Sequence, residues 1–278
     1  MRSFKALIDL TRPVNILITG LTVYVGGAIA GKDIEYAWLN LLVAAISAGL
    51  IAAGANALND YYDVAIDLIN RPDRPIPSGR IGRSVVPVWG GALIITGIVA
   101  GLILGWVTGV IAVTVALILW LYDSQLKQTF IWGNFAVALA GGAAFVYGGA
   151  AIGRIVPALI PAGFAFMIHF AREIVKDIED MDGDRVALAR TLPLVKGSRF
   201  ARVTAAVLLI LLALATILPY LYKIYSIRYL ILVVFTVFLP VIFLSGLLAS
   251  QSGNTKVRFI SQSLKIIMIT GLISLYVG

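Results

Sequence analysis

Six aspartates carry the clearest chemistry in this sequence. Asp60, Asp63 and Asp67 lie in the stretch NALNDYYDVAIDLINRPDRPIPSGR, which follows an apolar run long enough to cross a bilayer. On an α-helix, a spacing of three and then four residues places the carboxylates on one face. The same spacing returns in KDIEDMDGD, at Asp177, Asp180 and Asp184. Like charges on one face repel each other unless a cation lies between them, so the repetition predicts two cation-binding motifs.

The ligand types point to a hard divalent cation. The chain has one histidine and no cysteine, and oxygen ligands of this kind favour Mg²⁺, Mn²⁺ or Ca²⁺ over zinc or copper. Mg²⁺ commonly takes one or two carboxylates together with phosphate oxygens. Two facing motifs are therefore expected to hold two or more Mg²⁺ ions around a pyrophosphate, with Lys127, Arg74 and Arg80 on its remaining oxygens. An isoprenyl diphosphate fits, because the metal stabilises the leaving group and aromatic faces stabilise the allylic cation.

Composition places this chemistry in a membrane. The 278 residues are 60% hydrophobic and 13% charged, with a mean hydropathy of +0.97, whereas soluble domains are about one quarter charged. Apolar stretches of about 20 residues predict an all-α, polytopic bundle of about nine transmembrane helices rather than a barrel. The expected spans lie near 13–31, 37–58, 85–105, 108–124, 131–152, 157–175, 201–220, 228–249 and 258–277.

The basic residues predict the orientation. With these spans, one side of the membrane carries only Lys32, Arg154, Lys223 and Arg228, and the other carries the remaining 18 of the 22 lysines and arginines. By the positive-inside rule the N-terminus is cytoplasmic and the C-terminus lies outside the cell membrane. The net charge of +8 therefore reports topology and attraction to lipid head groups rather than nucleic-acid binding.

The two motifs sit at equivalent places in this topology. Each lies at the cytoplasmic end of a span, the second and the sixth, and these spans point the same way through the membrane. This parallel arrangement differs from a cation-coupled transporter, the main alternative, in which intramembrane carboxylates near the midplane and inverted repeats are typical. A membrane alcohol phosphotransferase, a second alternative, needs one compact motif rather than two separated copies. Gly141-Gly142 and Gly148-Gly149 in the fifth span predict close helix packing.

Over essentially its full length, the chain resembles the UbiA-type intramembrane prenyltransferases. The first motif of that family, an asparagine followed by spaced aspartates, matches Asn56 and the first triplet, with Asn59 adjacent, and the second motif matches the later triplet. A tyrosine–lysine element between them matches Tyr122 and Lys127 in YDSQLK, where the gap is one residue longer than the commonest family form. The resemblance implies a nine-helix bundle, a cytoplasmic-side cavity, Mg²⁺ dependence and prenyl transfer from a diphosphate, in one domain spanning 1–278.

Within that family, the two motif-bearing stretches look most like the archaeal branch that makes digeranylgeranylglyceryl phosphate. This resemblance implies geranylgeranyl diphosphate as the donor and the hydroxyl of geranylgeranylglyceryl phosphate as the acceptor. Relatives that act on aromatic acceptors in quinone, haem or chlorophyll pathways share the aspartate motifs, so an aromatic acceptor stays open. The cytoplasmic rim has more arginine and lysine than one pyrophosphate needs, which favours a phosphate-bearing acceptor, although positive-inside bias accounts for it equally.

Several further side chains are candidates for substrate binding. Arg12 and Asn15 enter the first span near the same face, and Tyr122 either covers the reacting carbon or anchors the interface. The sole histidine, His169, is expected to be a packed helix residue rather than a general base. Three more acids are expected to be loop charges or supporting groups rather than metal ligands: Asp73, Glu179 and Asp182.

Overall fold

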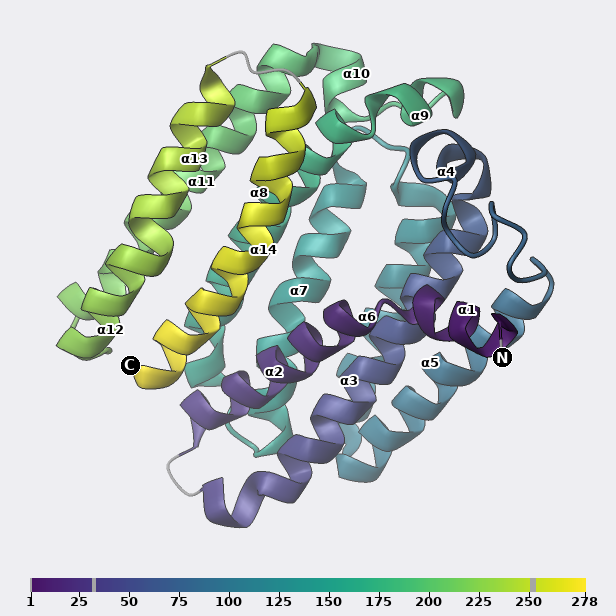
Figure 1. The fold of residues 1–278 in the computed structure, drawn as a ribbon. Helices are drawn as coiled ribbons and strands as arrows, with labels where there is room; N and C mark the ends of the chain where they lie inside the picture. The colour runs from purple at the N-terminus through teal and green to yellow at the C-terminus, as the bar shows by residue number, and fades with distance from the viewer. Residues whose placement is uncertain (1, 32–33, 251–253) are drawn as a thin grey trace.

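The computed structural model describes residues 2–31, 34–250 and 254–278, which fold into a helical bundle (Figure 1). The helices of the first half are α1 (Arg2–Thr11), α2 (Pro13–Ala30), α3 (Ile34–Tyr62), α4 (Val64–Asn70), α5 (Val85–Leu104), α6 (Trp106–Leu121), the π-helical turn η1 (Tyr122–Leu126) and α7 (Trp132–Ala151). Those of the second half are η2 (Val156–Ala158), α8 (Leu159–Glu179), α9 (Met181–Val186), α10 (Leu192–Lys196), α11 (Ser198–Leu221), α12 (Ile227–Val233), the π-helical turn η3 (Val234–Phe238), α13 (Leu239–Ala249) and α14 (Asn254–Val277).

Nine helical segments within the described ranges are long and apolar enough to cross a membrane, which confirms the predicted polytopic α-helical class. Large apolar side chains cover the outside of the bundle, including Ile103 at 77% exposure and Phe235 at 68%. Such a continuous apolar exterior is expected of a surface that faces lipid rather than water. The short helices α4, α9 and α10 gather at one end of the bundle, at the top of Figure 1.

The helices that carry the aspartates are longer than hydropathy predicted. α3 continues to Tyr62 and α8 to Glu179, whereas the expected spans ended at 58 and 175. Hydropathy falls where polar residues begin, but backbone hydrogen bonding continues beyond that point because each N–H still has its i−4 carbonyl. Asp60 and Asp177 therefore lie in the last turns of membrane-crossing helices, beyond the expected ends of the spans.

Helix α1 precedes the first span and was not expected. Ala6 and Leu10 on one face are fully buried against Ala57 of α3 and Val86 of α5, while Phe4 on the other face is 68% exposed. This amphipathic pattern is typical of a helix lying at a membrane interface. α1 ends next to Arg12, so its packing fixes where that residue meets α3.

Two apolar cores leave a space between them. The first-half core packs Val23, Leu41 and Ala112 between α2, α3 and α6, and the second-half core packs residues such as Ile174 and Leu264 between α8 and α14. α2 contacts both α7 and α14, which closes the bundle around its centre. The central cavity described below lies between these two cores.

Glycines allow α7 to approach its neighbours closely, as predicted. A β-carbon at Gly148 would overlap the carbonyl oxygen of Val23 on α2, and one at Gly142 would lie 2.8 Å from the carbonyl oxygen of Ala162 on α8. The backbones of α2, α7 and α8 therefore touch at positions where only a hydrogen atom fits.

We predict that Gly148→Ala destabilises the protein, because the added methyl group must push α2 and α7 apart. The melting temperature in detergent should fall by roughly 3–10 °C, the range expected when a packed contact is overfilled. Gly246→Ala is the matched control, because a β-carbon at Gly246 in α13 has no neighbour within 4 Å. Equal melting temperatures for the two variants would contradict the packing described here.

Candidate active site

Both aspartate motifs bend at their middle aspartate. Asp63 joins α3 to α4 with φ −88° and ψ 6°, and Asp180 joins α8 to α9 with φ −94° and ψ 7°. The spacing of the aspartates did not predict this break, at which the middle aspartate, a weak helix former, adopts the bridge region between helix and strand. Hydrogen bonding resumes at once, from the amide of Asp67 to the carbonyl of Asp63 at 2.8 Å and from Asp184 to Asp180 at 3.1 Å.

The two motifs lie at the same end of the bundle and touch. α4 packs against α9, and the side-chain amide of Asn70 donates to the backbone carbonyl of Asp180 at 3.3 Å. Arg71 also donates to the Asp180 carboxylate, at 3.2 Å. A β-carbon at Gly183 would overlap the Asn70 amide, so this close approach requires glycine. Segments more than 100 residues apart thus form one site, as the parallel repeat predicted.

Cations hold the carboxylates of the first motif. Arg74 Nη1 lies 3.0 Å from Asp60 Oδ1 and 2.6 Å from Asp67 Oδ2, so one guanidinium bridges the first and third aspartates. Arg12 Nη2 lies 2.5 Å from Asp60, and Lys127 pairs with Asp63. Each aspartate of this motif is at least 95% buried, with exposures of 2%, 5% and 3% along the chain. Buried carboxylates that lie this close together need cationic side chains beside them, because an unpaired buried charge is costly.

The second motif has fewer cationic partners. Asp177 accepts a hydrogen bond from the neutral amide of Asn134 at 2.7 Å, and Asp184 accepts one from the Thr191 hydroxyl at 3.5 Å. Burial and the negative charge of Asp180 raise the pKa of Asp184 to about 6, with Asp63 of the other motif adding to the effect. The second motif therefore carries negative charge that the protein neutralises incompletely.

A buried network lies behind the first motif. The Asn59 amide donates to Asp123 at 2.8 Å, and Arg12 donates to the Asn59 carbonyl oxygen at 2.8 Å. Arg12 itself has φ 54° and ψ 72°, a left-handed conformation that costs energy in a residue other than glycine. Its contacts with Asn59 and Asp60 hold it there. Sequence reasoning missed Asp123, because a single aspartate beside Tyr122 in YDSQLK carried no spacing signal.

The extra residue in the tyrosine–lysine element has a structural explanation. Residues Tyr122–Leu126 form the π-helical turn η1, and the amide of Lys127 donates to the carbonyl of Tyr122, five residues earlier, at 2.9 Å. A π-turn is the form in which an α-helix accommodates one inserted residue. The insertion is absorbed in the turn, and Lys127 still reaches Asp63.

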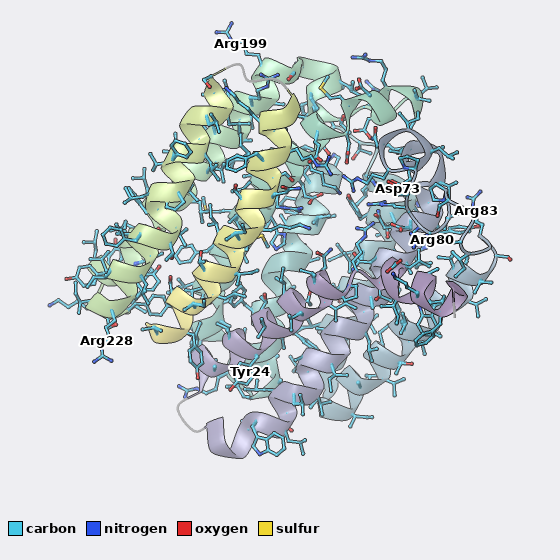
Figure 2. The ribbon with its side chains drawn as sticks, in the orientation of Figure 1. Tyr24, Asp73, Arg80, Arg83, Arg199 and Arg228 are labelled. Carbon is cyan, nitrogen blue, oxygen red and sulfur yellow. The ribbon has the colours of Figure 1, made fainter. Side chains whose placement is uncertain are left out.

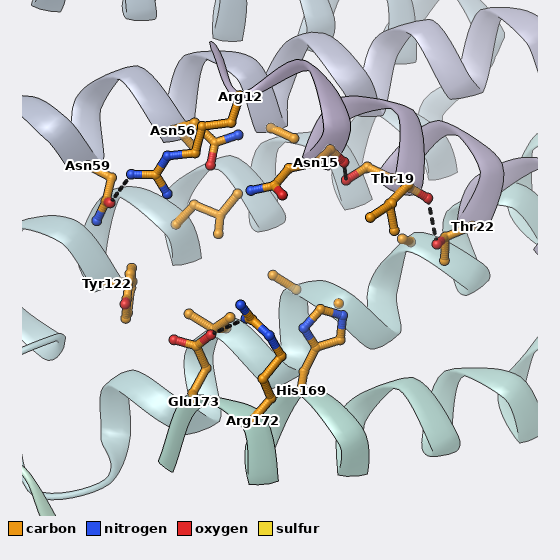
Figure 3. Close-up of a pocket in the computed structure, with 18 of the residues that line it drawn as sticks. Arg12, Asn15, Thr19, Thr22, Asn56, Asn59, Tyr122, His169, Arg172 and Glu173 are labelled. Carbon is orange, nitrogen blue, oxygen red and sulfur yellow. Dashed lines mark hydrogen bonds and ion pairs between the residues drawn. The ribbon is translucent and has the colours of Figure 1, made fainter. Parts of the chain in front are cut away.

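A cavity of about 660 Å³ lies beside the two motifs, between α2, α3, α6, α7, α8 and α14. Its lining includes six predicted substrate-binding residues, Arg12, Asn15, Asn56, Asn59, Arg74 and Tyr122, and Figure 3 shows most of them around its open centre. The motif aspartates lie behind this lining, paired with the arginines that face the cavity. Away from the aspartates the wall becomes apolar, with Ile51, Ile111 and Val115 among its residues.

The remaining candidates take different places. Arg80 is absent from the cavity lining; it is exposed, pairs with Asp9 at 2.6 Å and donates to the backbone carbonyl of Asp73, at the edge of the molecule in Figure 2. Asp73 and Asp182 are exposed, whereas Glu179 lines the cavity. His169 also lines it, packed against Gly141.

The donor set fits Mg²⁺ in its chemistry. Among the residues that the structure describes, no three acidic or histidine side chains are gathered closely enough to hold an ion by themselves. Mg²⁺ does not require such a cage, because it commonly uses one or two carboxylates and completes its shell with water and phosphate oxygens. The second motif offers carboxylates whose charge is incompletely neutralised, and it faces the first motif, whose carboxylates pair with arginine and lysine. This arrangement supplies the one or two carboxylates that Mg²⁺ needs.

Comparison with known proteins then identifies the family. The sequence model of the UbiA prenyltransferase family matches residues 19–269. The chain belongs to the UbiA prenyltransferase family. It is 34% identical over 273 residues to digeranylgeranylglyceryl phosphate synthase from Methanothermobacter thermautotrophicus, covering 98% of this chain and 95% of the relative. The enzyme of the same name from Methanopyrus kandleri is also 34% identical over 273 residues, covering 97% of each chain.

Solved structures agree with this membership in the UbiA family. A structure of a digeranylgeranylglyceryl phosphate synthase superimposes with a TM-score of 0.79 at 32% identity, covering 100% of this chain and 99% of the other. A UbiA homologue from Archaeoglobus fulgidus bound to GPP and Mg²⁺ shares the fold with a TM-score of 0.71 at 16% identity, covering 97% of this chain and 99% of that one. The protein is therefore a multi-pass membrane prenyltransferase, and the transporter alternative is wrong.

We predict that stability in the absence of divalent cations depends on Asp184. Its pKa, raised from 3.8 to about 6, means that the folded state holds the proton more tightly than the unfolded state does. The contribution of this proton to stability is therefore lost as pH rises from about 4 through 6. With chelator present, Asp184→Asn should melt a few degrees above wild type at pH 7.5 and by a smaller margin near pH 4.5.

Asp182→Asn is the control for this melting experiment, since Asp182 lies two residues before Asp184 and is exposed. This variant should melt like wild type at both pH values. Added Mg²⁺ should stabilise wild type more than Asp184→Asn. If Asp184→Asn were less stable than wild type at pH 7.5 in chelator, the Asp184 carboxylate would be stabilised by its neighbours, and the prediction would be wrong.

Proposed function

We propose that this UbiA-family enzyme transfers the geranylgeranyl group of geranylgeranyl diphosphate to the free hydroxyl of geranylgeranylglyceryl phosphate. The products are digeranylgeranylglyceryl phosphate, an ether-lipid precursor, and pyrophosphate. The observation that carries the proposal is the meeting of both aspartate motifs beside one cavity, in a chain that matches digeranylgeranylglyceryl phosphate synthases over almost its whole length. The preference for a lipid acceptor over an aromatic one rests on those same relatives.

In this proposal Mg²⁺ is the cofactor, and its ligands come from both motifs: Asp60, Asp63, Asp67, Asp177, Asp180 and Asp184. Two or more ions are proposed to bridge the motifs through the donor's diphosphate. Bound there, Mg²⁺ supplies positive charge that stabilises the departing pyrophosphate. The A. fulgidus homologue bound to GPP and Mg²⁺ supports this assignment through the shared fold.

Basic side chains beside the motifs are proposed to bind the diphosphate. Arg12, Arg74 and Lys127 each already contact a motif carboxylate, and Arg71 contacts Asp180. With Mg²⁺ held by the carboxylates, these four groups would be free to donate to phosphate oxygens, which guanidinium and ammonium groups favour. The same four residues thus hold the carboxylates in the free enzyme and bind the substrate in the complex. Asn56 and Asn59 orient this set through their contacts with Thr11 and Asp123.

The prenyl chain is proposed to lie along the apolar wall of the cavity. Ile51, Ile111 and Val115 line that wall, and Tyr122 lines the same cavity. The C–O bond to the diphosphate breaks and leaves an allylic carbon with cationic character, which an aromatic face stabilises. The acceptor hydroxyl oxygen then bonds to that carbon and its proton is released. One ether bond forms for each pyrophosphate produced.

The membrane orientation that the sequence predicts is part of this proposal. Arg199 and Arg228 lie at opposite ends of the bundle in Figure 2, and the end with Arg199 carries α4, α9 and both motifs. The positive-inside rule then makes this end cytoplasmic. The diphosphate donor would bind from the cytoplasm.

We predict that Asp60→Asn and Asp177→Asn each lower pyrophosphate release by at least ~100-fold, because each removes a carboxylate from the proposed metal site. The assay mixes purified enzyme, Mg²⁺, geranylgeranyl diphosphate and geranylgeranylglyceryl phosphate, and measures pyrophosphate and the ether product by mass spectrometry. Asp73→Asn and Asp182→Asn make the same change at exposed acids beside each motif, and should retain near-normal turnover.

Near-normal turnover of Asp60→Asn and Asp177→Asn would refute the metal role of the motifs. Turnover with an aromatic acid in place of the lipid acceptor, and none with geranylgeranylglyceryl phosphate, would keep the prenyltransferase chemistry and refute the acceptor.

A further inference from the structure

A second group of cations faces the cavity from the opposite side. Arg172 and Lys176 lie one turn apart on α8, and Arg258 and Lys265 lie two turns apart on α14, which packs against α8. All four line the cavity. In Figure 3, Arg172 points into the open centre from the wall that faces Arg12 and Asn15. We refer to these four residues as the α8–α14 cluster.

The α8–α14 cluster has an excess of positive charge. Glu173 accepts from Arg172 at 3.0 Å and lies 3.7 Å from Lys176. Arg258 and Lys265 form no ion pair within residues 2–31, 34–250 and 254–278. Within the described residues none of the four cations forms an ion pair with a motif aspartate, which distinguishes them from Arg12, Arg71, Arg74 and Lys127. Two carboxylates on α8, Glu173 and Glu179, line the cavity with these four cations. The remaining net positive charge favours the binding of a further anion.

One donor of the cluster is buried without a partner. The Nε atom of Arg172 is fully buried and makes no hydrogen bond, although the side chain retains 14% exposure through its other atoms. Buried polar groups in folded proteins are almost always hydrogen-bonded, so an unsatisfied donor at a cavity wall points to a ligand. Guanidinium groups bind phosphate through two parallel N–H donors, and Nε with one Nη is such a pair.

Both helices change from basic to apolar along the face that carries the cluster. On α8 the residues at successive turns below Lys176 and Arg172 are His169, Ala165 and Pro161, and on α14 Lys265 is followed by Met268, Leu272 and Leu275. These lower residues line an apolar side pocket of about 70 Å³. His169 and Met268 line both spaces, so this pocket adjoins the cavity. This surface suits a molecule with an anionic head and an apolar chain.

We infer that the α8–α14 cluster is a second anion-binding subsite, which recognises the phosphate of the acceptor lipid. This inference rests on the proposed function and assigns its two phosphorylated substrates to different walls. The donor's diphosphate binds at the aspartate motifs, where Arg12, Arg71, Arg74 and Lys127 are within reach. The acceptor's phosphate binds at Arg172, Lys176, Arg258 and Lys265, with its chain toward the apolar side pocket. Its free hydroxyl is thereby held in the cavity between the two walls.

The division between walls follows from the charges. The donor side carries six aspartates and needs metal ions before it can bind an anion, whereas the α8–α14 cluster carries excess positive charge and needs none. Binding of the acceptor phosphate is therefore expected without Mg²⁺. An acceptor that lacks the phosphate, such as an aromatic phenol, gains nothing from this cluster.

The test compares geranylgeranylglyceryl phosphate with its dephosphorylated alcohol, geranylgeranylglycerol. Arg172→Gln and Lys265→Gln should each lower kcat/KM for the phosphorylated acceptor at least ~10-fold, as expected for the loss of a charge-assisted hydrogen bond. The KM for geranylgeranyl diphosphate should change less than ~2-fold, and kcat/KM for the alcohol should stay near the low wild-type value. Arg258→Gln, at an exposed position, gives the same test without altering a buried group.

A binding measurement separates this inference from the proposed function. In chelator, geranylgeranylglyceryl phosphate should raise the melting temperature of wild type but not of Arg172→Gln, while Mg²⁺ with geranylgeranyl diphosphate should stabilise both. Arg199→Gln removes an exposed charge at the same end of the bundle, outside the cavity, and should behave as wild type. This control accounts for general attraction of the anionic lipid to a basic surface.

Three outcomes would overturn the inference. If the cluster variants impaired the use of donor and acceptor equally, the cluster would be assigned to the donor's diphosphate. If kcat/KM for the acceptor did not change, the cluster would have no role in substrate binding. Failure of wild type to bind or use geranylgeranylglyceryl phosphate would refute the proposed acceptor, and the inference with it. In the first two cases wild type still makes the ether product, so the two kinds of failure are distinguishable.

Discussion

The arrangement of this enzyme depends on the repulsion among carboxylates gathered in a poorly hydrated place. Three aspartates of the first motif are almost fully buried, and the second motif meets them through α4 and α9. Isolated buried charges are costly, so such a cluster persists only with cations next to it. Arg12, Arg74, Lys127 and Arg71 fill that role in the protein itself. The positions of α1, of η1 and of the loop after α4 all serve to bring those cations in.

This requirement explains features that look unrelated along the chain. α1 buries an apolar face against α3 and α5, and the left-handed backbone of Arg12 turns the chain so that its guanidinium reaches Asp60. The π-turn η1 absorbs an additional residue while Lys127 still pairs with Asp63. The prolines after α4 end the helix, and Arg74 in that segment bridges Asp60 and Asp67. Each of these features brings a positive charge to the carboxylates of the first motif.

Hydropathy and spacing predicted the class of fold, the number of spans and the meeting of the two motifs, because each depends on a strong periodic signal. The bends at Asp63 and Asp180 were not predicted, since a shift of one residue out of the helical region leaves the spacing unchanged. Asp123 and Arg172 were missed for another reason. Their importance depends on which helices become neighbours, and the local sequence around a charged residue does not indicate which helix will lie beside it.

In the proposed function, both motifs act on one metal–diphosphate complex. The most direct measurement is a double-mutant cycle on Mg²⁺-dependent binding of an unreactive geranylgeranyl thiolodiphosphate, by titration calorimetry. One shared site predicts that Asp60→Asn, Asp177→Asn and the double variant lose nearly the same binding free energy, because either change disables the complex. Two independent sites would give losses that add in the double variant, and that result would contradict the account.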